Sequence, residues 1–141
     1  MSATVLVVDD NLWARRLLCS ALQKHGYDTE QAADLAEVRQ LQRRCGPGWR
    51  VNLVLVELVR ERGNGFTVAA WLQSRGLGTV VLLSERQDNA DRLWARSRGI
   101  LHMLSRADGV GAMCARLNDI LAGRENACQA SDDRAGRAPC R

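Results

Sequence analysis

The chain has 141 residues, of which 46% are hydrophobic, and a formal net charge of +4 at pH 7. This length suits one domain with a sizeable core and is too short for two independent domains. The basic residues are scattered along the chain, which favours a solvated surface and argues against a nucleic-acid partner. Five cysteines, without a CxxC pair or a His/Cys metal spacing, indicate neither a disulfide framework nor a zinc site.

The apolar segments are all short. The chain enters an apolar strand directly after Ser2 and Ala3, without a basic leader. No apolar stretch approaches the roughly 20 residues that a membrane-spanning helix needs. We therefore expect a cytoplasmic protein that does not contact the membrane.

The first half of the chain alternates between strand and helix patterns. Residues 4–8 form a β-branched apolar run that predicts a buried strand, and the helical spacing that follows stops at Gly26. A short strand over 28–31 then leads into a helix that begins near Leu35 and ends in the breaker segment 46–48. These patterns predict two strand-helix units.

The second half repeats the alternation three times. Buried strands are predicted over residues 51–56, 80–83 and 100–104. Each is followed by apolar residues at helical spacing, and the last helix carries an apolar stripe from Val110 to Leu121. Strands that alternate with helices need right-handed crossovers that cover both faces of a parallel sheet. We therefore predict a doubly wound α/β fold with a five-stranded parallel sheet.

The domain is expected to span residues 1–122. From Gly123 onward the apolar periodicity disappears, and small, charged and polar residues dominate. Such a composition cannot bury enough apolar surface to fold by itself. We expect residues 123–141 to form a disordered C-terminal tail.

Polar residues of complementary type follow the predicted strands. Asp9 and Asp10 follow the first strand, Glu57 the third, Ser84 the fourth and Arg106 the fifth. In doubly wound folds the carboxyl ends of the strands form the binding crevice. Each residue taken singly has a simpler explanation as a helix cap or a strand end. Together they favour a phosphoryl-transfer site or its relic. Carboxylates suit Mg²⁺, and a hydroxyl and a guanidinium suit phosphoryl oxygens.

Six segments along the chain carry a recognisable pattern: Val7–Asn11, Leu53–Leu58, Asn64–Phe66, Leu83–Ser84, Gly99 and Leu104–Arg106. With them, the chain resembles the receiver domains of bacterial response regulators over about residues 3 to 122. The resemblance implies a flavodoxin-like (βα)5 fold with strand order 2-1-3-4-5. It also implies that paired acids bind Mg²⁺ and that an aspartate ending the third strand accepts phosphate. A Ser or Thr ends the fourth strand in this family, and a lysine follows the fifth.

Four positions depart from the receiver pattern. Glu57 stands at the phospho-acceptor position, Arg106 at the lysine position and Ala107 at the following proline, while Met103 occupies the aromatic switch position. Asp9, Asp10 and Ser84 keep the family's residue types. Glutamate carries its carboxylate about 1.5 Å further out than aspartate, towards the place of a phosphoryl group. Arginine offers a planar fork that pairs with a carboxylate.

These departures predict an atypical, stand-alone pseudo-receiver that is not an enzyme and in which Glu57 pairs with Arg106. As in the family, its protein partners, a histidine kinase or an effector, would dock on the fourth helix, fifth strand and fifth helix. The segment from Gln87 to Trp94, together with Asn64–Phe66, resembles receivers associated with type IV pilus twitching motility.

Two other functions remain open. One is a phospho-accepting receiver that serves as an intermediate or phosphate sink, with Mg²⁺ bound by Asp9 and Asp10. The other, from a different class, is a small Mg²⁺-dependent phosphatase, because such enzymes also carry acids at strand ends. The chain lacks a GxxxxGK[ST] loop and a GxGxxG turn, and its first two acids are adjacent rather than spaced as Asp-x-Asp.

Overall fold

The computed structural model describes residues 2–58, 64–85 and 89–123. Strands and helices alternate along the chain, as predicted. None of the helices in these ranges is both long and apolar enough to cross a membrane. The predicted tail lies outside the described residues, except for Gly123.

The elements are β1 Thr4–Val8, α1 Leu12–Lys24, β2 Asp28–Ala32, α2 Leu35–Cys45, β3 Leu53–Glu57, α3 Gly65–Arg75, β4 Thr79–Ser84, α4 Asn89–Ser97, β5 His102–Ser105, a 3-10 turn Arg106–Asp108 and α5 Gly109–Leu121.

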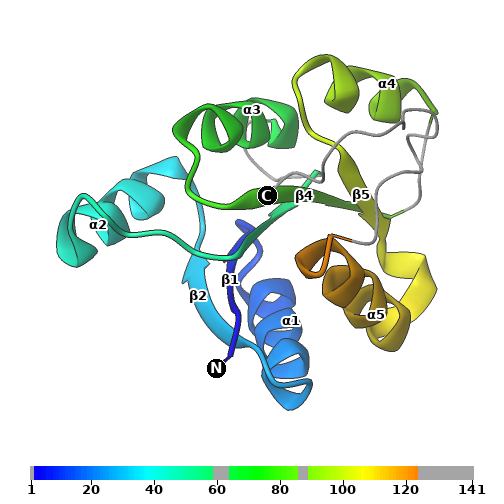
Figure 1. Cartoon of the computed structure of the whole chain (residues 1–141), viewed down its shortest axis with the longest axis horizontal. Helices are drawn as coiled ribbons and strands as arrows, with labels where there is room; N and C mark the ends of the chain where they lie inside the picture. Colours follow the sequence, from blue (N-terminus) through cyan, green and yellow to red (C-terminus); the bar gives the residue numbers. More distant parts are fainter. Residues whose placement is uncertain (1, 59–63, 86–88, 124–141) are drawn as a thin grey trace.

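The five strands form one parallel sheet in the order β2-β1-β3-β4-β5 (Figure 1). The register pairs Val8 of β1 with Val56 of β3, and Ser84 of β4 with Ser105 of β5. All carboxyl ends therefore lie at one edge of the sheet. This order confirms the predicted flavodoxin-like fold.

Helices cover both faces of the sheet (Figure 1). Alternate strand residues point to opposite faces, so Val5 and Val7 pack with α1 and α5, whereas Leu6 and Val8 pack with α2, α3 and α4. Two apolar cores result, one on each face. The central strands are buried on both faces, which explains why they are continuous apolar runs in the sequence.

Tertiary contacts set two strand boundaries that differ from the prediction. β3 begins at Leu53 rather than at Val51, whose amide donates to the carbonyl of Leu77 at 2.9 Å. β5 begins at His102 rather than at Ile100, whose amide donates to the carbonyl of Ala95 at 2.9 Å. Val51 thus contacts the segment before β4, and Ile100 closes the end of α4, before either strand enters the sheet ladder.

Side chains that cap the helices fix where they begin. The Asn11 side chain accepts a hydrogen bond from the amide of Ala14 at 2.9 Å and so starts α1 directly after the acids that follow β1. At α2, the Asp34 side chain caps the helix by accepting from the amide of Glu37 at 3.0 Å, and the Glu37 carboxylate accepts from the amide of Ala33, the residue before the cap, at 2.7 Å.

A comparison of two leucines on α1 tests the packing of the α1/α5 core. Leu22 is fully buried and Leu17 is 71% exposed. We expect Leu22→Ala to lower the free energy of unfolding by about 2–5 kcal/mol, because it leaves a cavity in a packed core. Leu17→Ala serves as the control and should change it by less than about 0.5 kcal/mol. Denaturant unfolding measures both, and equal effects would contradict this placement of α1.

Candidate functional site

All five polar residues predicted at the strand ends lie at one edge of the sheet in buried or partly buried positions. Asp9, Glu57 and Ser84 are 2%, 7% and 3% exposed, respectively, and the Arg106 side chain is 27% exposed. Asp10 is more accessible than Asp9. Parallel strands bring these residues together although they are separated by up to 97 positions in the chain.

Arg106 is the centre of this cluster. Its Nε and Nη2 atoms donate to Oε1 of Glu57 at 2.8 and 2.5 Å, and Nη2 also donates to Oδ2 of Asp9 at 3.3 Å. One guanidinium thus bridges the carboxyl ends of β1 and β3. The predicted pair of Glu57 and Arg106 is present in the structure, and both of its hydrogen bonds go to the same carboxylate oxygen. We call Asp9, Glu57 and Arg106 the acid–arginine cluster.

Local hydrogen bonds hold Asp9 in place. Its Oδ1 atom accepts from the amide of Asn11 at 2.9 Å, which leaves Oδ2 directed at Arg106. Its backbone carbonyl accepts from Nη1 of Arg15 at 2.7 Å, and Nε of Arg15 donates to Gln31 at 3.0 Å. Arg15 was missed from sequence because it lies within α1 and contacts a backbone atom, which no motif signals.

Ser105 was also missed as a site residue, although it belongs to the segment that carries the family resemblance. Its hydroxyl donates to the carbonyl of Glu85 at 2.8 Å and accepts from the amide of Ala107 at 3.1 Å. The second bond caps the 3-10 turn that begins at Arg106. Ser105 thereby fixes the turn that carries the guanidinium, next to Ser84 on the neighbouring strand.

Gly65 explains why α3 approaches the end of β3 so closely. A Cβ atom built on this residue would lie 2.4 Å from the carbonyl oxygen of Leu58 and 2.6 Å from that of Glu57. Backbone oxygens cannot yield as a flexible side chain would, so the position requires glycine. The Asn64 side chain caps the helix by accepting from the amide of Phe66 at 2.7 Å. The segment Asn64–Phe66 is therefore a tight helix start beside the candidate acceptor position.

Met103, at the position of the family's aromatic switch, is a buried core residue. It is 4% exposed and packs in the core beneath α2, α3 and α4. The flexible thioether fills the interior of the sheet face. The Met103 side chain therefore points into the core.

The acid–arginine cluster, as arranged, does not fit Mg²⁺. The guanidinium lies within hydrogen-bond distance of both Asp9 and Glu57 and carries the positive charge that a bound cation would otherwise supply. Within the described part of the chain, no group of three or more His, Cys, Asp or Glu side chains is placed to hold a metal ion. Binding of Mg²⁺ between these carboxylates requires Arg106 to be displaced.

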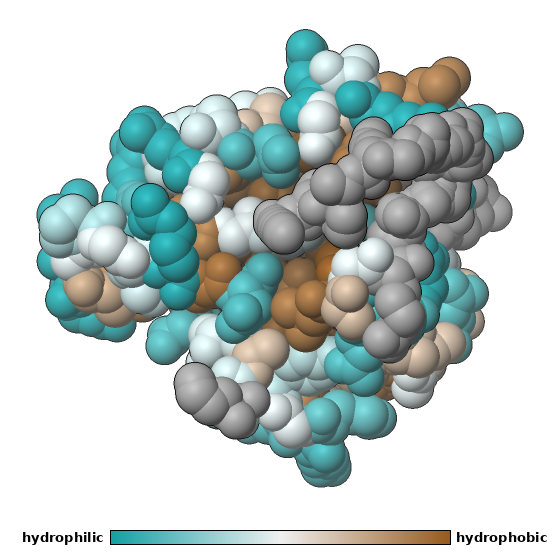
Figure 2. Space-filling model, viewed as in Figure 1, coloured by the Kyte–Doolittle hydropathy of each residue, from teal (hydrophilic) through white to brown (hydrophobic). Residues whose placement is uncertain are grey.

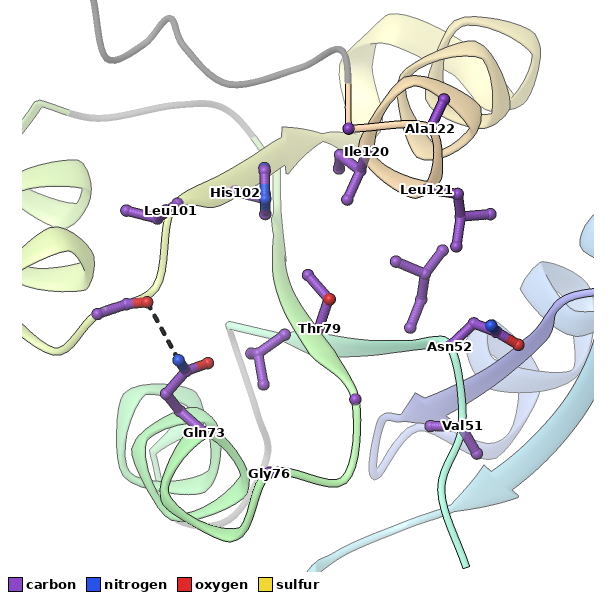
Figure 3. A pocket seen from close by; sticks show the side chains of 15 residues that line it. Val51, Asn52, Gln73, Gly76, Thr79, Leu101, His102, Ile120, Leu121 and Ala122 are labelled. Carbon is purple, nitrogen blue, oxygen red and sulfur yellow. Dashed lines mark hydrogen bonds between the residues drawn. The ribbon is translucent and has the colours of Figure 1, made fainter. Parts of the chain in front are cut away.

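A separate hollow opens at the opposite edge of the sheet (Figure 3). The amino-terminal parts of β3 to β5 and the ends of α3 and α5 form its walls, and Gln73 donates to the carbonyl of Gly99 at 3.2 Å. Among the described residues that line it there is no Asp, Glu, Lys or Arg. This hollow therefore contributes nothing to the acid–arginine cluster.

Two curated proteins that are similar to the chain differ in their own length. Aerobic respiration control protein ArcA of Escherichia coli K12 is 24% identical over 130 residues, which are 92% of this chain and 53% of ArcA. Protein PilH of Pseudomonas aeruginosa is 24% identical over 124 residues, which are 86% of this chain and 99% of PilH. The chain thus spans about half the length of ArcA and nearly all of PilH.

Solved structures share the fold. A response regulator from Thermotoga maritima superposes with a TM-score of 0.71 at 20% identity, covering 86% of this chain and 99% of that one. Chemotaxis response regulator CheY4 of Vibrio cholerae gives 0.69 at 21% identity, covering 84% and 98%. The family model of the response regulator receiver domain matches residues 5–118. The chain therefore belongs to the response regulator receiver family of two-component signalling.

Proposed function

We propose that this receiver domain is a pseudo-receiver, which acts by protein–protein contact and carries Glu57 in place of a phospho-accepting aspartate. The observation that supports this proposal is the bonding of Arg106 to Glu57 and Asp9. Two buried carboxylates at one edge repel each other, and a shared cation offsets that repulsion. One guanidinium thus offsets part of the negative charge of the two carboxylates without Mg²⁺ or phosphate.

The residues involved favour one lasting state over a switch. A carboxylate oxygen that accepts two hydrogen bonds from a guanidinium is a weak nucleophile, because its electron density is already shared. Glu57 also reaches further than aspartate would, which places a negative charge further out from the strand end, towards the place of a phosphoryl group. Together with the buried Met103, these features support a receiver that holds its signalling conformation permanently.

The output surface of this proposal comprises α4, β5 and α5. Leu93 on α4 is 69% exposed and Leu101, just before β5, is 57% exposed. Large exposed apolar side chains are common at protein interfaces. Trp94 packs against Phe66 with ring centroids 4.1 Å apart, which anchors α4 to α3 beneath this surface. A histidine kinase or an effector protein is the proposed partner.

The proposed pathway is type IV pilus motility. Support comes from Asn64–Phe66 and from residues 89–94, which belong to the segment from Gln87 to Trp94 that resembles such receivers. Gln87 and Asp88 of that segment lie outside the described residues. The match to Protein PilH along nearly its whole length adds to this support.

A phospho-accepting receiver is the second candidate. Asp9, Asp10 and Ser84 keep the family's residue types at the carboxyl ends of β1 and β4, and family membership itself favours phosphate chemistry. In this case Arg106 would have to release the two carboxylates. The two candidates therefore differ in whether the native chain takes up phosphate.

Incubation with acetyl phosphate and Mg²⁺, followed by intact mass measurement, separates the two candidates. We expect no adduct on the native chain, and an adduct on the double variant Glu57→Asp/Arg106→Lys, which restores the family's residue types. Glu57→Gln is the matched control and should stay unmodified, because it removes the carboxylate without restoring the acceptor. A phosphate adduct on the native chain would exclude the pseudo-receiver.

A double-mutant cycle measures the strength of the ion pair. For Glu57→Gln, Arg106→Met and the combination, we expect a coupling free energy of about 1–3 kcal/mol, between the values for exposed and fully buried pairs. Arg16→Met, on the exposed side of α1, is the control and should shift stability by less than about 0.5 kcal/mol. A coupling free energy below about 0.5 kcal/mol between Glu57 and Arg106 would show that the cluster does not hold the site together.

Deletion of the gene tests the pathway and the output surface together. We expect the deletion to alter the twitching zone of the host strain and the native gene to restore it. Glu57→Gln and Leu93→Asp should fail to restore it, because they remove the permanent charge and the exposed apolar contact, respectively. Leu17→Asp, on α1, is the matched surface control. An unchanged twitching zone after deletion would remove the proposed pathway.

A further inference from the structure

Trp71 on α3 lies beside two guanidinium groups that come from different helices. The Cζ atom of Arg39, on α2, is 5.3 Å from the ring centroid, and that of Arg75, one turn further along α3, is 4.5 Å away. Both distances are within the range of cation–π attraction. Trp71 itself is partly buried and packs against the core, so its ring is a fixed support. The two guanidinium groups are therefore held at defined places on the surface.

Neither guanidinium is engaged by a carboxylate. Arg39 and Arg75 are exposed, and within the described ranges neither makes an ion pair or a hydrogen bond. Each keeps five N–H donors available to a ligand. This contrasts with Arg106, whose donors are directed at two carboxylates. Side chains that are already ordered lose less conformational entropy when they bind.

The surroundings of this pair are basic. Arg43, one turn after Arg39 on α2, is also exposed. α3 carries no acidic residue, and the only acid within α2, Glu37, has one carboxylate oxygen engaged by the amide of Ala33 at 2.7 Å. Figure 2 shows mostly hydrophilic or neutral colours over α2 and α3, with apolar atoms deeper between the layers. We call Arg39, Arg43, Trp71 and Arg75 the α2–α3 basic surface.

We propose that the α2–α3 basic surface binds an acidic segment of a partner protein, with carboxylates paired to Arg39 and Arg75. A planar guanidinium matches a carboxylate through two parallel hydrogen bonds, which gives direction as well as charge attraction. The surface lies on helices other than α4 and α5, so this partner and one at the proposed output surface bind at the same time. The proposal does not depend on the state of Glu57.

Charge and shape favour a protein segment over nucleic acid. The three arginines are fewer than the roughly six to ten phosphate contacts that give tight binding to nucleic acid. The one aromatic ring is partly buried and already contacted by guanidinium groups, which limits base stacking.

Fluorescence anisotropy with a labelled peptide of alternating aspartate and glycine tests this proposal. We expect the native chain to bind the peptide and Arg39→Gln/Arg75→Gln to bind it at least about tenfold more weakly. The matched control, Arg16→Gln/Lys24→Gln, removes the same charge from exposed residues on α1 and should change binding less than about twofold. Trp71→Phe retains an aromatic support and should bind like the native chain.

Three outcomes would overturn the proposal. The first is that the native chain does not bind the peptide. The second is that both double variants lose binding equally, which would indicate that net charge alone causes the binding. A single-stranded oligonucleotide that binds more tightly than the peptide, and loses binding in the Arg39→Gln/Arg75→Gln variant, would assign the surface to nucleic acid. The single variants Arg39→Gln and Arg75→Gln, checked by thermal unfolding, separate loss of binding from loss of fold.

Discussion

Two carboxylates, Asp9 and Glu57, are buried at neighbouring strand ends, and the structure of this edge depends on how their charge is compensated. Burial of an unpaired charge costs several kcal/mol, so a counter-charge has to lie within reach. Arg106 supplies it, bonded to Glu57 at 2.8 Å and to Asp9 at 3.3 Å. Ser105 caps the turn that carries Arg106, and Asn11 orients Asp9. The cluster is thereby supported from three strands.

This arrangement is the physical basis of the proposed pseudo-receiver. An internal guanidinium lies between the two carboxylates, and the carboxylate of Glu57 is carried by a longer side chain than that of an aspartate. Arginine is used in two ways in this chain. At Arg106 its donors are directed at buried carboxylates, whereas Arg39 and Arg75 are exposed and their guanidinium groups lie against a tryptophan ring. The first use supports a fixed state, and the second supports contact with a partner.

Some parts of the site were beyond prediction from sequence for identifiable reasons. The bond from Arg15 to the carbonyl of Asp9 joins a helix side chain to a backbone atom, and such contacts leave no pattern of residue types. The starts of β3 and β5 were placed two residues too early. An apolar run does not reveal that its first residue bonds elsewhere, as Val51 does to Leu77 before β4 and Ile100 does to Ala95 at the end of α4. The contacts of Arg39 and Arg75 with Trp71 could not be predicted either, because the two arginines are 36 positions apart in the chain and lie on different helices.

The amino-acid sequence by itself determined the five strand-helix units, the doubly wound parallel sheet and the identity of the residues at the strand ends. It could do so because apolar periodicity, glycine breakers and capping side chains act over a few residues. The tertiary structure alone decided that Arg106 also bonds to Asp9, that both of its bonds to Glu57 go to one carboxylate oxygen, and that two arginines share one tryptophan. Those contacts depend on strand order and helix packing, which bring together residues that the chain keeps far apart.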